Sequence, residues 1–180
     1  PIPSRGLGDV YKRQHGHPMD WLSVGIHTLG MYDTTGDWLE DALNLIARMP
    51  RLMGLIFRYR EGRETDIPGD DVSQTLVDRF VNTLDLENVD KRKMARVVST
   101  YLVLHMDHGG GNLSTFTGKS IASGKATIYS AIAGAMNALS GPLHGRANQS
   151  CLEFVLKVGT SDEDEVCLLY TSDAADDVEC

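Results

Sequence analysis

The sequence predicts an all-α fold, and three observations support that prediction. Apolar residues recur every three or four positions along most of the chain, as they do on the buried face of an amphipathic helix. Proline and glycine stand at the edges of these periodic runs, where helices begin and end. No stretch alternates between apolar and polar residues for long enough to predict a β-strand.

The expected helices follow one another along the chain. The first begins at Pro18, which suits the first position of a helix, and ends at Gly30. The second begins near Asp37, is kinked or broken by Pro50 and resumes as far as Gly62. The remaining segments are expected as a loop at 64–71 and as helices at 71–84, 89–104, 112–122, 127–139 and 147–158.

Two of these helices carry unusual side chains. The helix at 89–104 begins with cations, which oppose the positive end of the helix dipole, and its apolar face is expected to point inward. That face consists of Met94, Val97, Val98, Tyr101 and Leu104.

The helix at 127–139 carries a face of small residues that permits close helix approach, and we expect it at a subunit boundary. These small residues are Ser130, Ala133, Gly134 and Ala138.

The charge and the composition exclude several classes of protein. The net charge of −8 argues against a nucleic-acid surface, which needs a basic stripe. No apolar run approaches the roughly 20 residues that a membrane-spanning helix requires. Two of the three cysteines lie in the last segment of the chain, and Cys151 is the remaining one. An internal disulfide is therefore not expected, and a reducing compartment is favoured.

The two ends of the chain carry the pattern of a foreign oligonucleotide. Residues 9–14 read DVYKRQ, which the DNA sequence GAT GTG TAT AAG AGA CAG encodes. The reverse complement of that DNA, read one frame over, encodes residues 167–172. Such an inverted pair resembles a transposase sequencing adapter translated as protein. We therefore expect 1–14 and 167–180 to be adapter-derived tails that are not native, and 15–166 to be one helical fragment.

The first candidate site is the run HMDHGGGN, which begins at His105. His105 and His108 lie three residues apart and share one face at the end of a helix. Gly110 and Gly111 let the backbone approach a ligand and adopt positive φ, and Asn112 is a favoured N-cap for the next helix. Free N–H groups at that helix start favour an anion such as a carboxylate. A glycine-rich turn with one buried and one surface histidine is the alternative, and so few ligands disfavour a metal.

The second candidate site is the run GPLHG at 141–145. Gly-Pro fixes a tight turn, and Leu143 and His144 follow it just before the last helix. A helix N-terminus and burial both disfavour the imidazolium, so His144 is expected to stay neutral near pH 7. A neutral imidazole can donate a hydrogen bond to a carbonyl that becomes an enolate, as in triosephosphate isomerase. The alternative is that His144 only caps the helix.

Together the two motifs resemble those of the citrate synthase family. That family shows a segment like His-x-Asp-His-Glu-Gly-Gly-Asn and, one helical hairpin later, Gly-Pro-Leu-His-Gly-x-Ala-Asn. His108, Asn112 and His144 fall at the matching positions, in the same order. Gly109 and Arg146 depart from the family, in which Glu is common at the first position and Gly or Leu at the second. Because both lie beside the motifs, they put the substrate preference in question.

The resemblance extends upstream and implies a role for each motif. The runs HPMD at 17–20 and YREG at 59–62 are similar to family segments too. His144 would hydrogen-bond the thioester carbonyl of acetyl-CoA and stabilise its enol form. His108 would bind oxaloacetate in a pocket that Asn112 helps to shape. The other substrate-binding candidates are His105, Gly110, Gly111 and Leu143.

The resemblance implies an acyltransferase that condenses acetyl-CoA with oxaloacetate to give citrate and CoA. It implies the family's multi-helical fold, mostly its large domain, a homodimer, and no cofactor besides acetyl-CoA as a substrate. The family's aspartate base, a further histidine and arginines are expected downstream, so the fragment is expected to be inactive alone. The alternatives are a 2-methylcitrate synthase, which uses propionyl-CoA, and a non-catalytic helical module that binds an anion. The implied compartment is the cytoplasm of a bacterium or the mitochondrial matrix of a eukaryote.

Overall fold

The protein is built from α-helices joined by turns and loops. The computed structural model describes residues 16–69, 71, 73–106, 109–145 and 147–159. No strand occurs among these residues, so the predicted all-α class is confirmed. The chain divides into two compact units, Pro1–Leu139 and Ser140–Cys180, and each is described by itself. Both tails that we expect to be foreign lie outside the described residues.

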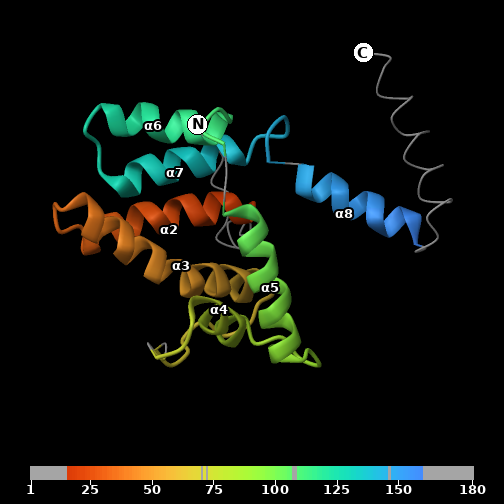
Figure 1. Ribbon diagram of the computed structural model, residues 1–180. Coiled ribbons are helices and arrows are strands. Elements are labelled where there is room, and N and C mark those ends of the chain that lie inside the picture. Colours follow the sequence, from red (N-terminus) through yellow and green to blue (C-terminus); the bar gives the residue numbers. More distant parts are fainter. Residues whose placement is uncertain (1–15, 70, 72, 107–108, 146, 160–180) are drawn as a thin grey trace, which may run out of the picture. The chain divides into compact units, whose positions relative to one another are not determined.

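Six described helices belong to the first unit. They are α2 (Pro18–Asp33), α3 (Trp38–Arg60), α4 (Leu76–Leu84), α5 (Lys91–His105), α6 (Leu113–Ser123) and α7 (Ile128–Leu139). Helix α7 packs on α6, α2 and α3, while α4 joins α3 to α5 (Figure 1). The second unit contains α8 (Ala147–Val158). None of the described helices is long and apolar enough to cross a membrane.

The core lies where α2, α3 and α7 meet. Ile26 is 0% exposed, and Tyr129 of α7 is 1% exposed. The full cluster consists of Leu22, Ile26, Leu45, Tyr129 and Ala133. Gly30 does not end α2, which continues to Asp33. A Cβ atom on Gly30 would lie 2.7 Å from the Cβ of Tyr129, so this glycine lets α2 approach α7.

The small residues of α7 pack inside the chain. Ala133 is 0% exposed in the core, and a Cβ atom on Gly134 would collide with Ile121 of α6. The expectation that this face lies at a subunit boundary is therefore wrong for these two residues. The physical reason is that α6 and α2 of the same chain already pack closely against these small residues of α7.

Helix α3 continues through Pro50 without a break. Pro50 is buried and lies inside the helix, where its ring nitrogen cannot donate the usual bond to a carbonyl four residues earlier. Most of a helix's stability in a protein comes from packing of its apolar face rather than from one backbone bond. The contacts of α3 with α2, α4 and α7 thus keep the helix intact.

Local side-chain bonds set the start of α4 and α5. The helix expected from residue 71 begins at Leu76, because Thr75 Oγ1 accepts the N–H of Asp78 at 3.1 Å and caps it. Asp71 instead accepts the N–H of Ser73 in a turn, which competes with the helix. At the start of α5, the Asp90 carboxylate accepts two backbone N–H groups and offsets the cations that follow.

The expected inward face of α5 is not buried. Among the described residues of the chain, none on α5 falls in the buried class, and Val97 and Leu104 are 69% and 74% exposed. The prediction of a covered face was wrong for these residues. The amphipathic pattern is present, but α4 is the described helix that packs against α5.

A buried carboxylate closes the turn between α2 and α3. Asp41 is 3% exposed and accepts hydrogen bonds from Thr34 Oγ1 at 2.9 Å, Thr35 N at 2.7 Å and Thr35 Oγ1 at 2.9 Å. The backbone N–H of Thr35 is the main reason that the pKa of Asp41 lies below its ordinary value of 3.8. The turn is therefore fastened to α3 through an ionised side chain.

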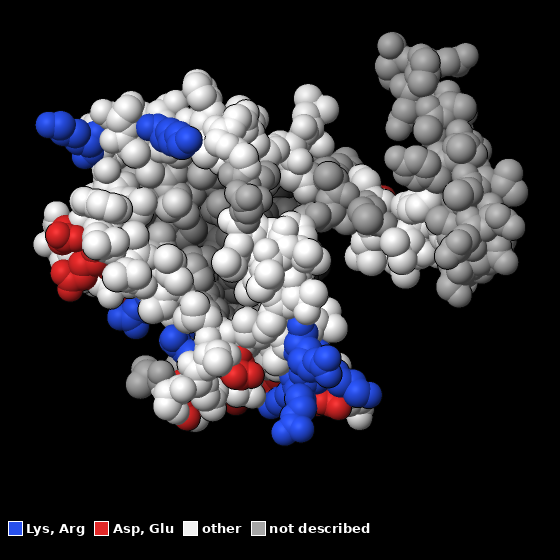
Figure 2. All heavy atoms as spheres, viewed as in Figure 1, with Lys and Arg blue, Asp and Glu red and all other residues white. Residues whose placement is uncertain are grey.

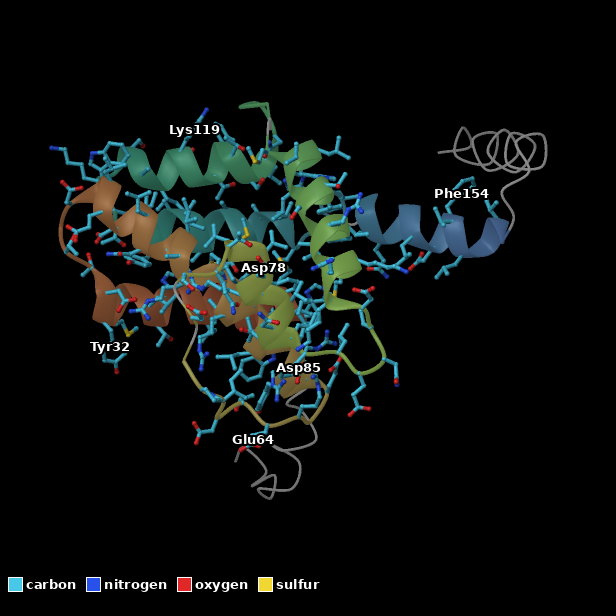
Figure 3. The ribbon with its side chains drawn as sticks, turned by 60° about the horizontal axis from the view of Figure 1, so that its bottom comes forward. Tyr32, Glu64, Asp78, Asp85, Lys119 and Phe154 are labelled. Atoms are coloured by element: carbon cyan, nitrogen blue, oxygen red, sulfur yellow. The ribbon has the colours of Figure 1, made fainter. Side chains whose placement is uncertain are left out.

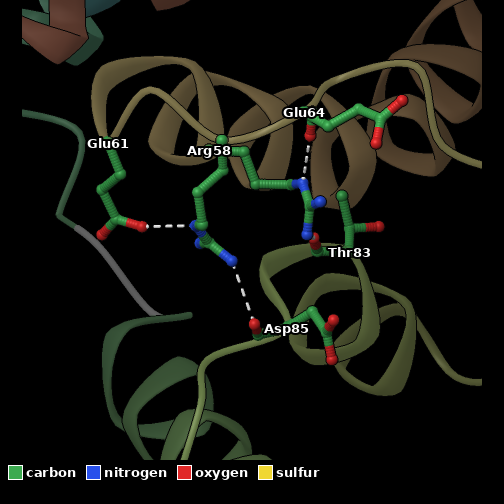
Figure 4. A network of polar contacts seen from close by, with 6 residues as sticks. Arg58, Glu61, Glu64, Thr83 and Asp85 are labelled. Carbon is green, nitrogen blue, oxygen red and sulfur yellow. Dashed lines mark hydrogen bonds and ion pairs between the residues drawn. The ribbon is translucent and has the colours of Figure 1, made fainter.

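Arginine side chains fasten the chain that follows α3. Arg58 donates to the carbonyl of Glu64 at 2.6 Å (Figure 4) and to that of Thr83 at 3.4 Å. Arg63 donates to the carbonyl of Asp85 at 2.9 Å. These bonds satisfy carbonyl groups outside the helical ladder, and they connect the loop to the end of α4.

Candidate active site

The glycine loop, residues 109–111, leads into α6 at Asn112, whose side chain hydrogen-bonds to both the loop and the helix. The Asn112 Oδ1 atom accepts the N–H of Thr115 at 2.8 Å and the hydroxyl of Ser114 at 2.7 Å. The Nδ2 atom donates to the carbonyl of Gly109 at 2.8 Å. The predicted N-cap is confirmed, and the same amide also ties the loop to the helix start.

Lys119 reaches back toward this loop from α6. A Cβ atom on Gly110 would lie 2.9 Å from the ammonium nitrogen of Lys119, whereas Gly109 and Gly111 have open space around them. Gly110 and Gly111 do not adopt the positive φ that we expected. The Lys119 ammonium is the movable end of a long side chain, so its contact does not by itself require glycine at position 110. Figure 3 shows Lys119 on α6. We did not predict Lys119, although its position two turns after Asn112 places both on one face.

The structure describes His105 of the first motif, whereas His108 lies outside the described residues. The exposed ring of His105 stacks on Tyr101, with centroids 3.9 Å apart, and its Nδ1 lies 2.7 Å from the Tyr101 carbonyl oxygen. Because a carbonyl only accepts, Nδ1 carries the hydrogen in this bond, and Nε2 is the acceptor of the neutral ring. Among the described residues, these contacts hold His105 against α5 rather than against the glycine loop.

The second motif forms the expected tight turn in the other unit. The carbonyl of Gly141 accepts the N–H groups of His144 at 3.0 Å and of Gly145 at 3.2 Å. The His144 side chain is half-buried, while Leu143 is fully exposed. The turn presents His144 shortly before α8, as the sequence predicts. Arg146, which departs from the family pattern, lies outside the described residues.

The described residues offer no cluster for a metal ion. Among them, no three His, Cys, Asp or Glu side chains gather closely enough to hold one. The functional groups that the structure places are thus an asparagine-fixed glycine loop with a nearby ammonium, and a histidine on a hydrogen-bonded turn. Such groups can bind carboxylates and donate hydrogen bonds to oxygen atoms.

The family of the chain follows from comparison with known proteins. The family described as "Citrate synthase, C-terminal domain" matches residues 6–178. The chain belongs to the citrate synthase family. This finding agrees with the resemblance of the two motifs.

The relatives are longer than this chain. It is 37% identical over 136 residues to the mitochondrial citrate synthase of Citrus maxima, an alignment that covers 74% of this chain and 27% of the relative. It is 35% identical over 122 residues to the mitochondrial 2-methylcitrate synthase of Yarrowia lipolytica, which covers 66% and 25%. The chain spans about a quarter of the length of these curated relatives.

Solved citrate synthases share the fold. The structure from Thermotoga maritima MSB8 matches with a TM-score of 0.69 over 100% of this chain and 47% of that one; at 24% identity it bears on the fold alone. The structure from Pyrobaculum aerophilum matches with a TM-score of 0.66 at 28% identity, over 81% of this chain and 39% of that one. The expected multi-helical, citrate-synthase-like fold is therefore confirmed.

Proposed function

We propose that this chain is part of an acyltransferase that condenses acetyl-CoA with oxaloacetate to give citrate and CoA. The observation that supports it best is that both family motifs occur in the family's order and that each forms a local structure closed by hydrogen bonds. One is the glycine loop held by Asn112, and the other is the turn that carries His144. Acetyl-CoA is a substrate in this proposal, and no metal or other cofactor is required.

The glycine loop is the proposed oxaloacetate pocket. In this proposal His108 binds the substrate, and the N–H groups of Gly110 and Gly111, which precede α6, are candidate donors to its carboxylates. The two ends of the Asn112 amide already bond to the loop and to the helix, so Asn112 acts by fixing the pocket's shape. The Lys119 ammonium adds a positive charge that favours a dicarboxylate. His105 and Leu143 are the remaining substrate-binding candidates.

His144 is the proposed hydrogen-bond donor to acetyl-CoA. When a base removes a methyl proton, negative charge develops on the thioester oxygen, and a donor aimed at that oxygen stabilises the enol form. The base is expected among residues outside this sequence, where the family has its aspartate. No aspartate of the described segments is assigned to that role.

The substitution His144→Ala in the full-length enzyme tests this role. Turnover should fall by roughly 10²–10³, the typical effect of removing one such donor, while oxaloacetate affinity changes little. Release of the CoA thiol and titration with oxaloacetate measure the two quantities. The exposed His27 on α2 supplies the control His27→Ala, which should leave both unchanged. Intact turnover with lost oxaloacetate binding would mean that the two histidine roles are exchanged.

The 180-residue chain alone should form no citrate. It lacks the expected base, and the loss of a general base typically costs about 10²–10⁴ in rate. CoA release from this chain that depends on both oxaloacetate and acetyl-CoA would contradict the placement of the base. The same assay on the full-length protein distinguishes an enzyme from a helical module that binds oxaloacetate without chemistry.

The acyl donor has a second candidate, propionyl-CoA. The similarity to the Yarrowia lipolytica protein and the glycine at position 109 motivate this alternative. One methylene changes kcat/KM by about 10–200-fold in a selective pocket, so the ratio for acetyl-CoA and propionyl-CoA decides between them. The substitution Gly109→Glu introduces the family's common residue into open space, and a shift in that ratio would assign specificity to this position.

We propose a homodimer as the assembly. A groove of about 420 Å³ follows α6 and α7, and half-buried apolar residues line its α7 side. These are Ile128, Ile132, Met136 and Leu139. A second copy related by a twofold axis is the simplest closed partner. Sedimentation of the full-length protein tests this, and a monomer would contradict it. The proposed compartment is the mitochondrial matrix of a eukaryote or the cytoplasm of a bacterium.

The end segments are proposed to be adapter sequence. Resequencing the source DNA across positions 14–15 and 166–167 should replace 1–14 and 167–180 by other codons. The family match at 6–178 reaches into both segments. Native codons at those positions would reject the adapter origin.

A further inference from the structure

The hairpin of α6 and α7 carries positive charge and no acidic residue. Between Gly109 and Gly145 the sequence contains two lysines, Lys119 and Lys125, and neither Asp nor Glu. The whole chain has a net charge of −8, so this stretch differs from the rest. In Figure 2 the cations over α6 lie among uncharged atoms, whereas those at the lower end of α5 lie beside carboxylates. The charge on the hairpin is therefore not offset by acidic residues of its own sequence.

Lys119 is the lysine that reaches the glycine loop. A Cβ atom on Gly110 would lie 2.9 Å from its ammonium nitrogen. The Lys119 side chain also lines the groove of about 420 Å³ along α6 and α7, together with Thr115 and Ala122. Its methylene stem thus follows an apolar surface while the ammonium extends to the loop, which is a common arrangement for lysine. None of the ion pairs among the described residues includes Lys119.

The glycine loop has room for a ligand beside this ammonium. Nothing lies within 4 Å of a Cβ atom built on Gly109 or on Gly111. The Asn112 amide is already occupied, because Nδ2 donates to the Gly109 carbonyl and Oδ1 accepts the N–H of Thr115, both at 2.8 Å. Lys119 is therefore a charged donor that the structure places at the open loop.

We propose that Lys119 determines acceptor specificity at the glycine loop, because its ammonium favours a dicarboxylate over a 2-oxo acid that has one carboxylate. This inference rests on the proposed function, which assigns the oxaloacetate pocket to the same loop. The attraction between an ammonium and a ligand grows with the negative charge of the ligand, so the second carboxylate adds to it. Water and salt screen an exposed ammonium, so the gain in affinity is a few-fold.

Calorimetric titration of the full-length protein with oxaloacetate tests the role of Lys119. Lys119→Gln should weaken binding roughly 2–5-fold at low ionic strength, the effect of an exposed charge pair, and less as salt is added. Lys119→Arg keeps the charge and should keep most of the affinity. Pyruvate, a 2-oxo acid with one carboxylate, should lose less affinity than oxaloacetate in Lys119→Gln. Lys125→Gln, the matched control, removes the other exposed lysine of the hairpin and should bind like the unchanged protein.

Gly110→Ala moves the ammonium without changing any charge. The added methyl group would lie 2.9 Å from the Lys119 nitrogen, so the end of that side chain must shift. Neither Gly110 nor Gly111 has a positive φ, so alanine suits the backbone at both positions. Gly110→Ala should weaken oxaloacetate binding more than Gly111→Ala, which adds the same methyl group to open space. In the Lys119→Gln protein this difference should disappear, because the two substitutions then no longer act through the ammonium.

The titrations separate this inference from the proposed function. An unchanged protein that binds no oxaloacetate would overturn both. Binding of oxaloacetate that Lys119→Gln leaves unaltered, or that Lys125→Gln weakens equally, would overturn the specificity role alone. An equal loss for oxaloacetate and pyruvate would do the same. Lys119 is exposed, so its replacement should leave the melting temperature unchanged, and thermal melts of each variant check this.

Discussion

Helix α2 and helix α5 both carry apolar residues at helical spacing, yet these residues have opposite environments. Ile26 of α2 is completely buried, whereas Val97 of α5 is 69% exposed. Helix α2 lies against both α3 and α7, while α5 packs on α4. The comparison shows that periodicity identifies which face of a helix is apolar, and that packing partners decide whether the face is covered.

The difference arises from what each helix can approach. Gly30 lets α2 come close to Tyr129 of α7, and Ala133 fills the remaining space without a large side chain. For α5, we propose that the cover is a part of the longer family fold, since this chain matches 47% of the Thermotoga maritima chain. Four substitutions test this contrast, ordered from the largest expected effect to the smallest.

Ile26→Ala should destabilise the fold most. Removing a fully buried isoleucine costs about 2–5 kcal/mol of unfolding free energy, through lost burial and the cavity that remains. Val97→Ala on α5 is the matched control and should stay within about 0.5 kcal/mol in the 180-residue chain. Urea unfolding measures both. Equal losses would remove the contrast between the two helices.

The effect of Leu104→Ala should differ between the 180-residue chain and the full-length protein. In the 180-residue chain Leu104 is 74% exposed, so its loss should change stability little. If the full-length fold covers α5, the same substitution there should cost about 1.5–3 kcal/mol, which is typical of burying a leucine. A small effect at both lengths would mean that the face of α5 stays open.

Gly30→Leu tests the close approach of α2 to α7. The new side chain would meet Tyr129 at less than van der Waals distance, and overpacking of this kind costs about 1–3 kcal/mol. Gly69→Leu is the control, since nothing lies within 4 Å of a Cβ atom there. A thermal melt that shifts equally for both variants would argue against the contact.

Asp41 should make the packed region sensitive to acid. Its pKa is lowered in the folded state, so the stability that it contributes is present above its ordinary value of 3.8. That contribution is lost as the pH falls below 3.8 toward the folded-state pKa. Asp41→Asn should flatten this part of the curve of unfolding free energy against pH. An unchanged curve would show that the carboxylate does not fasten the turn.

The sequence predicted the helices better than their ends or their surroundings. Apolar spacing located each helix because side chains on one face must share a partner. Helix ends depend on single bonds, so the Thr75 cap moved the start of α4, and the tertiary contact at Gly30 let α2 continue. Pro50 inside α3 shows the same principle, since packing outweighed one missing donor.

The candidate site was predicted where it depends on local chemistry. The Asn112 cap and the turn before His144 are short-range features, and both are confirmed. Lys119 was missed because its approach to Gly110 depends on the direction of a long side chain. The stacking of His105 on Tyr101 was missed for the same reason. The catalytic and substrate-binding roles of these residues stay predictions.

The amide of Asn112 has a consequence for the entropy of ligand binding. A run of three glycines samples more backbone conformations than any other tripeptide, and fixing one residue costs about 1–2 kcal/mol in conformational entropy. Because Asn112 bonds to the Gly109 carbonyl and to the Thr115 N–H, much of that ordering is completed when the chain folds. A ligand that enters the loop then meets a preorganised surface, and more of its contact energy becomes affinity.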